Sequence, residues 1–334
     1  TSNSKCSILL TETYNDTNGN PLATMSDVAV VNATTDSNAP VMTSYDLNMT
    51  SRTFSLRFSK PVDAATFVSS EVTLQNTGDS SFTTNFTLSD GLNATALFEP
   101  GRWPVSSPVP CTYSSEAGCL KTNTSYFTAL QFSLSDRDFN NVTANTELAT
   151  SSLTTFVTVT ALMVSDPYNN SVVSISSTNA QAVSQYTGDS AKPSVASFSL
   201  DMDSRIMAVT FSETVNSSTL NASHFYLSKT TNASVDVVQL SFLGANNTYS
   251  TVHEVTISKA EFSRITAIGF ASSENDVFLT ASAGSVRDMS NNLALATPSP
   301  LAPSVFVVET TRPTLTEFAC DMDSTTLMLT FSET

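Results

Sequence analysis

Residues 193–215 read PSVASFSLDMDSRIMAVTFSETV. The same pattern occurs twice more without a gap: residues 40–62 read PVMTSYDLNMTSRTFSLRFSKPV, and residues 313–334 read PTLTEFACDMDSTTLMLTFSET. Apolar side chains stand at every second position, as at Met207, Val209 and Phe211. This is the period of a half-buried β-strand. Because a polar turn such as Asp201-Met-Asp-Ser separates two such runs, each copy is predicted to be a β-hairpin.

The hairpins recur at the spacing of domains. Their opening prolines are Pro40, Pro193 and Pro313, so 153 and 120 residues separate one start from the next. A hairpin that recurs at this spacing indicates tandem β domains. We predict two complete repeats and parts of two others: 1–39 is the C-terminal part of one repeat, 40–192 and 193–312 are complete repeats, and 313–334 is the N-terminal part of a further repeat.

Short helices and tight turns are expected between the strands. Ser135 is followed by Asp138, and Ser258 by Glu261, which is the spacing of a capping box at the start of a helix. A single helical turn capped by Asp63 is expected after the first hairpin. A turn of the form Asp-x-x-(Gly/Asn)-Asn recurs at 16–20, 166–170 and 288–292. Asp and Asn tolerate left-handed backbone, so each of these segments is predicted to close tightly.

The first complete repeat is longer than the second because of an insertion at 88–121, which holds Trp103 and two cysteines. Cys111 and Cys119 bracket a short turn-like loop. In an oxidising compartment we expect them to form a local disulfide, with a metal or redox role as the alternative. Trp103 either packs the insertion onto its own sheet or forms a surface that binds sugar or another subunit.

The partial repeats at the two ends allow two interpretations. The chain is a window from a longer repeat polypeptide, or residues 313–334 of one copy and residues 1–39 of the next share a domain and join copies by strand complementation. In the second case Cys6 could pair with Cys320 between units. Otherwise Cys320, which stands at the position of Leu200, is expected to be a small core residue.

The composition limits the partners of the chain. Asp and Glu total 30 against 14 Lys and Arg, a formal net charge of −16. Such a chain repels nucleic acid and anionic membranes, so neither is an expected partner. No apolar run approaches the roughly 18 residues of a transmembrane helix. A hydrophobic fraction of 40% with 20 Phe argues against wholesale disorder.

Glycosylation sequons indicate the compartment. Twelve asparagines stand in Asn-x-Ser/Thr: Asn15, Asn32, Asn48, Asn85, Asn93, Asn123, Asn141, Asn169, Asn216, Asn221, Asn232 and Asn246. This density on an acidic, lysine-poor β chain favours a secretory origin with N-linked glycans. We expect an extracellular or cell-surface location.

The segments Phe58-Ser-Lys-Pro-Val-Asp-Ala-Ala-Thr-Phe67 and Phe211-Ser-Glu-Thr-Val-Asn-Ser-Ser-Thr-Leu220, each followed later by the Asp-x-x-(Gly/Asn)-Asn turn, resemble bacterial-type Ig-like repeats of surface-layer proteins and adhesins. Thr214 departs from the Pro of that family pattern. Long chains with the added helix and dense sequons are also similar to mastigoneme-like surface glycoproteins of algae and stramenopiles. The resemblance implies tandem Ig-like β-sandwich repeats with structural or adhesive work and no catalytic residues.

Calcium at the hairpin turns is the one metal hypothesis that the sequence raises. Two turns carry Asp-Met-Asp, and other acids stand at places where they could lie near them: Asp201, Asp203, Asp321 and Asp323 in the turns, with Glu213, Asp288 and Glu309 elsewhere. The first hairpin has Asn48-Met-Thr50 instead, a sequon whose glycan would occupy such a site. We therefore expect solvated turns and no metal or other cofactor, with calcium as the alternative.

The residues favour a structural role over catalysis. The only histidines are His224 and His253, and no nucleophile elbow, His-rich metal motif or phosphate loop is present. We predict a non-enzymatic building block of an extracellular glycosylated filament or surface coat, assembled head to tail as a homopolymer. The alternative is a cell-surface adhesin that binds carbohydrate or protein through the 88–121 insertion.

Overall fold

The structure is a computed structural model that describes residues 36–96, 126–232, 235–241 and 248–332, with short pieces at 7–8, 15, 17–21 and 28–29. Within these residues β-strands predominate, which confirms the predicted all-β class. Near the N-terminus β1 (Ser7–Ile8) pairs antiparallel with β2 (Val28–Ala29). None of the helices in the described part is both long and apolar enough to cross a membrane.

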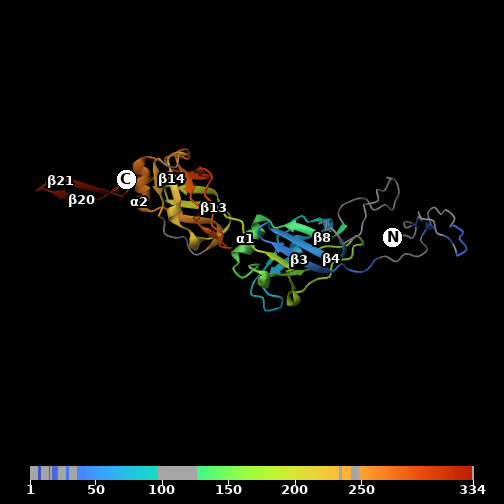
Figure 1. The fold of residues 1–334 in the computed structure, drawn as a ribbon. Helices are drawn as coiled ribbons and strands as arrows, with labels where there is room; N and C mark the ends of the chain where they lie inside the picture. The colour runs from blue at the N-terminus through green and yellow to red at the C-terminus, as the bar shows by residue number, and fades with distance from the viewer. Residues whose placement is uncertain are drawn as a thin grey trace.

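The first unit, residues 36–187, is a β-sandwich (Figure 1). One sheet has the order β11-β3-β4-β8-β7, with β3 (Met42–Asn48), β4 (Thr53–Asp63), β7 (Thr95–Ala96), β8 (Tyr126–Ser133) and β11 (Gln185–Thr187). The other has the order β10-β9-β5-β6, with β5 (Val72–Gln75), β6 (Asn85–Thr87), β9 (Phe156–Val159) and β10 (Gln181–Ala182). Side chains from both sheets meet in one hydrophobic core.

The alternating residues of the first hairpin form the centre of that core. Tyr45, Leu47, Phe54 and Leu56 are all 0% exposed, as their period of two predicts. The Tyr45 hydroxyl donates a hydrogen bond to the carbonyl of Thr155 at 3.0 Å, so its polar end is satisfied inside the sandwich. Removing each such side chain from water stabilises the fold by about 1.5–3 kcal/mol.

The second unit, residues 188–307, repeats this arrangement. One sheet has the order β16-β13-β12-β19, with β12 (Val195–Asp201), β13 (Ile206–Asn216), β16 (Tyr249–Thr256), β19 (Val305–Val307) and, paired to β13, β18 (Arg287–Asp288). The other has the order β15-β14-β17, with β14 (Phe225–Ser228), β15 (Val237–Gln239) and β17 (Phe278–Ala281). The hairpin register is the same: Tyr45 lies opposite Leu56, and Phe198 opposite Val209.

Helices begin where the capping signals predict. In α2 (Lys259–Ile268) the Ser258 side chain accepts from the backbone of Glu261, and the Glu261 carboxylate accepts in return from Ser258. In α1 (Asp136–Ala144) only half of the predicted box forms, because Asp138 accepts from Ser89 instead. Each helix turns two large apolar side chains inward: Phe139 and Val142 of α1 and Phe262 and Ile265 of α2 are buried.

Short 3₁₀ turns connect several strands: η2 (Ala64–Thr66), η3 (Ser69–Glu71), η4 (Ser152–Thr154), η5 (Ser177–Asn179), η6 (Ser217–Thr219) and η7 (Ala222–His224). Asp63 caps η2 as predicted, because its side chain accepts from the backbone N–H of Ala65. The recurrent Asp-x-x-(Gly/Asn)-Asn turns contain a left-handed residue, with φ of 67° at Asn169 and 71° at Asn291. Tight closure of these two turns is therefore confirmed.

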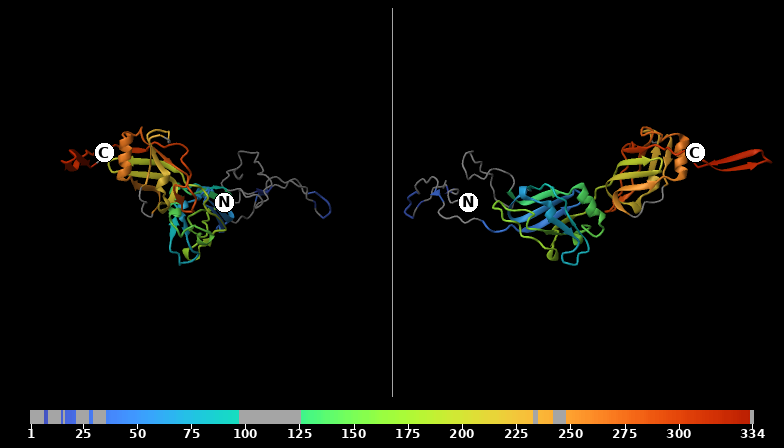
Figure 2. Two further views of the ribbon diagram at one scale, coloured as in Figure 1. Left: turned by 60° about the vertical axis from the view of Figure 1, so that its left-hand side comes forward. Right: turned by 180° about the vertical axis from the view of Figure 1, so that it is seen from behind.

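A third hairpin, β20 (Leu315–Asp321) with β21 (Thr326–Phe331), projects beyond the second unit (Figures 1 and 2). Its register repeats that of the other two, with Phe318 opposite Leu329. Every residue of both strands is exposed. Phe318 is 65% exposed, whereas Phe198 at the same place in the second unit is 0% exposed. The same residue pattern therefore yields a core in two copies and a bare surface in the third.

Candidate functional site

The first and second units meet through a small set of polar contacts. The backbone N–H of Thr214 on β13 donates to Asn140 Oδ1 on α1 at 2.9 Å, and the Thr214 hydroxyl donates to the Asn140 carbonyl at 3.1 Å. On the connecting segment, the backbone N–H of Ser190 donates to Thr50 Oγ1 at 2.9 Å. These bonds tie the connecting segment and β13, the longest strand of the second unit, to the first unit.

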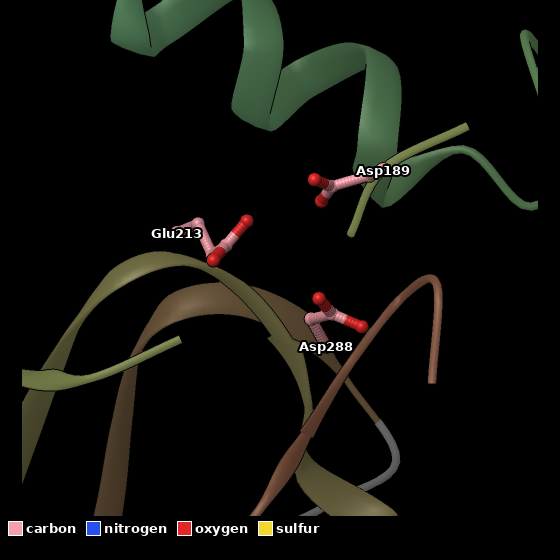
Figure 3. Close-up of side chains that lie close together, drawn as sticks. All are labelled: Asp189, Glu213 and Asp288. Atoms are coloured by element: carbon pink, nitrogen blue, oxygen red, sulfur yellow. The ribbon is translucent and has the colours of Figure 1, made fainter. Parts of the chain in front are cut away.

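Three carboxylates gather beside this junction. Asp189 comes from the connecting segment, Glu213 from β13 and Asp288 from β18, and one oxygen of each lies within 4.8 Å of the others. Figure 3 shows the three side chains turned toward one another. Glu213 is 3% exposed and Asp288 4%, while Asp189 is half-buried. Glu213 neighbours Thr214 in the sequence, so the cluster adjoins the contact with α1.

The cluster is electrostatically unfavourable when all three groups are charged. Burial raises the pKa of Glu213 to about 8, and the charges of Asp189 and Asp288 add to the shift, against a smaller opposing effect of Arg52. Burial also raises the pKa of Asp288. Buried carboxylates of like charge must bind protons or a cation to lower this energy. The Arg52 guanidinium is already bonded to Asp136, at 2.5 Å.

The equivalent place in the first unit holds a lysine. Lys60 Nζ lies 2.6 Å from Asp36 Oδ2 and 2.6 Å from Asp166 Oδ2, and it also donates to the carbonyl of Asn38. Burial opposes ionisation of Asp166, but hydrogen bonds from Lys60 and Asn170 outweigh it and lower the pKa of Asp166 to about 2. In the first unit an ammonium group therefore neutralises two carboxylates. The equivalent place in the second unit holds three carboxylates and no lysine.

The acids that the sequence singled out for calcium are mostly used elsewhere. Asp201 Oδ1 accepts from the backbone N–H groups of Asp203 and Ser204, and Asp321 Oδ1 does the same in the third hairpin. Asp203 accepts from Thr310, through both its backbone N–H and its hydroxyl. These carboxylates thus accept hydrogen bonds from their own turns or from the segment that follows β19.

The cluster could have been found in the sequence from one signal. The sequence suggests Glu213 and Asp288 as calcium ligands only together with the hairpin turns, and it does not suggest Asp189. The aligned copies place Lys60 and Glu213 at the same position, 153 residues apart. A charge reversal at an otherwise repeated position indicates a change in what the neighbouring carboxylates bind.

The sequons fall mainly on the surface. The sequon asparagines that lie exposed on the surface are Asn15, Asn85, Asn93, Asn141, Asn169, Asn221 and Asn232. Asn48 and Asn216 are half-buried, and their side-chain oxygens accept from the backbone of Ser51 and Ser218. Asn32, Asn123 and Asn246 lie outside the described residues. Modification of the twelve asparagines stays a prediction.

The structure bears on only one of the four cysteines. Cys320 is exposed on β20, with its sulfur 3.6 Å from that of Met322, so it is not the core residue that its alignment with Leu200 predicts. Leu200 lies in the hydrophobic core of the second unit, whereas every residue of β20 is exposed. Cys6, Cys111, Cys119 and most of the 88–121 insertion with Trp103 lie outside the described residues, and the disulfide pairings stay predictions.

Comparison with solved structures finds bacterial surface-layer proteins. The chain is 15% identical to a crystal structure of the S-layer protein rSbsC(31-844), over 88% of this chain and 32% of that one, with a TM-score of 0.21. A structure of domains 1-6 of surface layer protein SbsC matches at 14% identity over 88% of this chain and 32% of that one, with a TM-score of 0.21. An N-terminal part of SbsC matches at 14% identity over 80% of this chain and 44% of that one, with a TM-score of 0.20.

The chain thus spans about a third of the length of the first of these structures, at 32%. No family model matches the sequence, and no curated protein matches it.

Proposed function

We propose that this chain is a non-enzymatic building block of an extracellular, glycosylated filament or surface coat, assembled head to tail from Ig-like repeats at 40–192 and 193–312. The observation that carries the proposal is the third hairpin. Its strands repeat the register of the two buried hairpins, yet its apolar side chains face solvent. A surface of this kind binds a complementary sheet.

The exposed face has the apolar pattern of the buried hairpins in the two sandwiches. Phe318, Leu327 and Phe331 are 65%, 62% and 49% exposed, while their counterparts Phe198, Met207 and Phe211 are at most 2% exposed. Covering each of the three side chains would stabilise the contact by about 1.5–3 kcal/mol. That gain would offset much of the roughly 4–15 kcal/mol that association of two chains costs.

The proposed occupant of this face is a second copy of the chain. Residues 1–39 are predicted to supply the C-terminal part of a repeat, because Ile8-Leu-Leu-Thr matches Val277-Phe-Leu-Thr of the second unit. Joining that segment to the hairpin of the preceding copy would make a heterologous, open contact, which propagates as a filament. Glycans on the exposed sequons would keep the lateral surfaces hydrated and the growth linear.

The test is electron microscopy of the native material together with sedimentation of the purified chain and two variants. Phe318→Asp places a charge on the hairpin face, and Leu153→Asp places one on a side chain that is 82% exposed but lies in the first unit. Head-to-tail assembly predicts filaments and concentration-dependent association for wild type and Leu153→Asp, and their loss in Phe318→Asp. Equal association of all three chains, or a monomer in which the hairpin is covered by its own polypeptide, contradicts the proposal.

A further inference from the structure

The turn at 16–20 has the conformation of the turn that closes each complete unit. The same isolated β-bridge spans it in all three places: Asn15 with Pro21, Ser165 with Ser171 and Arg287 with Leu293. The left-handed residue also stands at the same position, with φ of 82° at Gly19, 67° at Asn169 and 71° at Asn291. The described part of this turn therefore has the geometry of the C-terminal part of a repeat.

In each complete unit the last residue of this turn holds the segment that leads into the hairpin. The Asn170 side chain donates to the carbonyl of Asp36 at 3.1 Å, and the Asn292 side chain donates to the carbonyl of Asp189 at 3.2 Å. Both asparagines are half-buried, whereas Asn20, which stands at their place in the first turn, is exposed. The bond joins the end of a repeat to its beginning.

The third hairpin has the acceptor of this bond without the donor. Glu309 stands before the opening proline of that hairpin, at the place of Asp36 and Asp189. Among the described residues no hydrogen bond reaches the carbonyl of Glu309, and its carboxylate oxygen Oε1 is buried without a partner. A buried acceptor that lacks a donor is costly. The segment before the third hairpin is thus incomplete within the described part of one copy.

The donor and the acceptor lie at opposite ends of the molecule. Figure 1 shows the third hairpin at one end and the described pieces of 7–29 at the other. Within one copy Asn20 therefore does not reach Glu309. We propose that the turn at 16–20 of one copy docks on the second unit of the preceding copy, where the Asn20 side chain donates to the carbonyl of Glu309. This contact rests on the proposed head-to-tail assembly and adds a polar surface to the apolar face of the hairpin.

The junction inside the chain shows what else the docked turn contacts. Met289 and Ser290 belong to the turn of the second unit, and they line a pocket together with Met49 and Tyr186 of the first unit. The middle of the turn therefore lies against the far end of the preceding unit. The same placement of the next copy brings its own turn to the far end of the second unit.

The far end of the second unit has a pocket of its own. Met202, the counterpart of Met49, lines this pocket together with Glu309. Thr17 and Asn18 of the next copy stand at the middle of the docking turn and are exposed. Their hydroxyl and amide groups can donate to the carboxylate of Glu309. The turn thus carries the kind of group that the buried oxygen of Glu309 needs.

The consequence is a regular assembly. A junction between copies that reuses the contact found inside the chain gives successive domains one spacing, whether or not the polypeptide is continuous between them. Such a contact is heterologous, because the turn at one end binds a different surface at the other, so it propagates without closing.

The first test compares Asn20→Ala with Asn292→Ala in the full chain. The two substitutions remove equivalent side chains, one between copies and one within a copy. Asn20→Ala should weaken association about 10-fold and leave the melting temperature of the dilute chain unchanged. Asn292→Ala should lower the melting temperature of the second unit and keep association within about twofold of wild type. Sedimentation at a series of concentrations and thermal unfolding measure the two quantities.

The second test is a double-mutant cycle between Thr17 and Glu309. Thr17→Lys places an ammonium group on the docking turn, and Glu309→Gln removes the negative charge from its partner. Direct contact predicts that Thr17→Lys favours association at least about threefold more with Glu309 than with Glu309→Gln, at low salt. The cycle cancels the general effect of an added positive charge on an acidic chain.

The outcomes separate this contact from the assembly on which it rests. A wild type that stays monomeric at every concentration overturns the assembly, and the contact with it. Wild type that associates, with loss of association in Phe318→Asp, leaves the assembly standing. In that case the docking is overturned if Asn20→Ala associates as wild type does, or if the cycle between Thr17 and Glu309 shows no coupling.

Discussion

Lys60 and Glu213 occupy the same position on equivalent strands of the two units, 153 residues apart, and carry opposite charges. The lysine forms two short ion pairs with Asp36 and Asp166, whereas the glutamate faces Asp189 and Asp288. Two neighbouring β-sandwiches thus share a frame at the point where the chain enters them, and differ in how the charge of that frame is balanced.

The first prediction compares two phenylalanines at one register position. Phe198→Ala should destabilise the second unit by about 3–5 kcal/mol, because Phe198 is 0% exposed and its loss leaves a cavity. Phe318→Ala at the matching place of the third hairpin should change the unfolding free energy of the dilute chain by less than about 0.5 kcal/mol. Urea unfolding followed by circular dichroism measures both. Equal effects of the two substitutions would mean that the third hairpin is packed against other residues in solution.

The second prediction concerns acid. The folded-state pKa of Asp166, about 2, lies below its ordinary value of 3.8, so the stability it supplies is present above about pH 4 and is lost as the pH falls toward 2. Lys60→Met should destabilise the first unit by about 1–3 kcal/mol at pH 7, since Asp166 then stays buried without its cation. The difference from wild type should shrink between pH 4 and pH 2. Chemical unfolding at a series of pH values measures it, and a constant difference would contradict the role of this ion pair.

The third prediction tests the contact between the units. Asn140→Ala removes the acceptor for the backbone N–H of Thr214 and should broaden the distribution of angles between the units. Small-angle scattering should show a larger spread of dimensions, while the melting of each sandwich changes little. Asn141→Ala, on the exposed side of the same helix, is the control. Both variants are made without glycosylation, because Asn141 is itself in a sequon. Identical scattering from all three chains would show that other contacts set the angle.

The fourth prediction ranks the glycosylation sites. Exposed sequons such as Asn85 and Asn93 should be occupied more fully than Asn48 and Asn216, whose side-chain oxygens already bond neighbouring backbone. Mass spectrometry of the secreted chain before and after enzymatic deglycosylation gives the occupancy at each asparagine. Full occupancy of the half-buried pair would show that modification precedes the folding of these turns.

The fifth prediction uses the two helix caps. Ser258→Ala should destabilise the second unit by about 1 kcal/mol or more, because it removes a reciprocal box in which Ser258 and Glu261 bond each other. Ser135→Ala should cost about the same or less in the first unit, since Asp138 is held independently by Ser89. Thermal unfolding of the two variants measures the difference. A larger loss for Ser135→Ala would reverse the ranking.

Local signals were sufficient for the elements of the fold. Period-two alternation placed Tyr45, Leu47 and Phe54 inside, and Ser and acid at the right spacing began α1 and α2. These predictions succeed because strand pleating and helix capping depend on residues a few positions apart. The half-formed box at Asp138 shows the limit, since a residue far along the chain, Ser89, took its carboxylate.

By itself the sequence determined the β class, the three hairpins and the helix starts, because each of these follows from the spacing of neighbouring residues. Only the tertiary structure decided which hairpin faces are covered and which carboxylates meet. Phe198 and Phe318 share one local pattern, and their burial differs because it depends on strands from elsewhere in the chain. Asp189 and Asp288 lie 99 residues apart in the sequence, and β13 and β18 must pair before their oxygens can come together with those of Glu213.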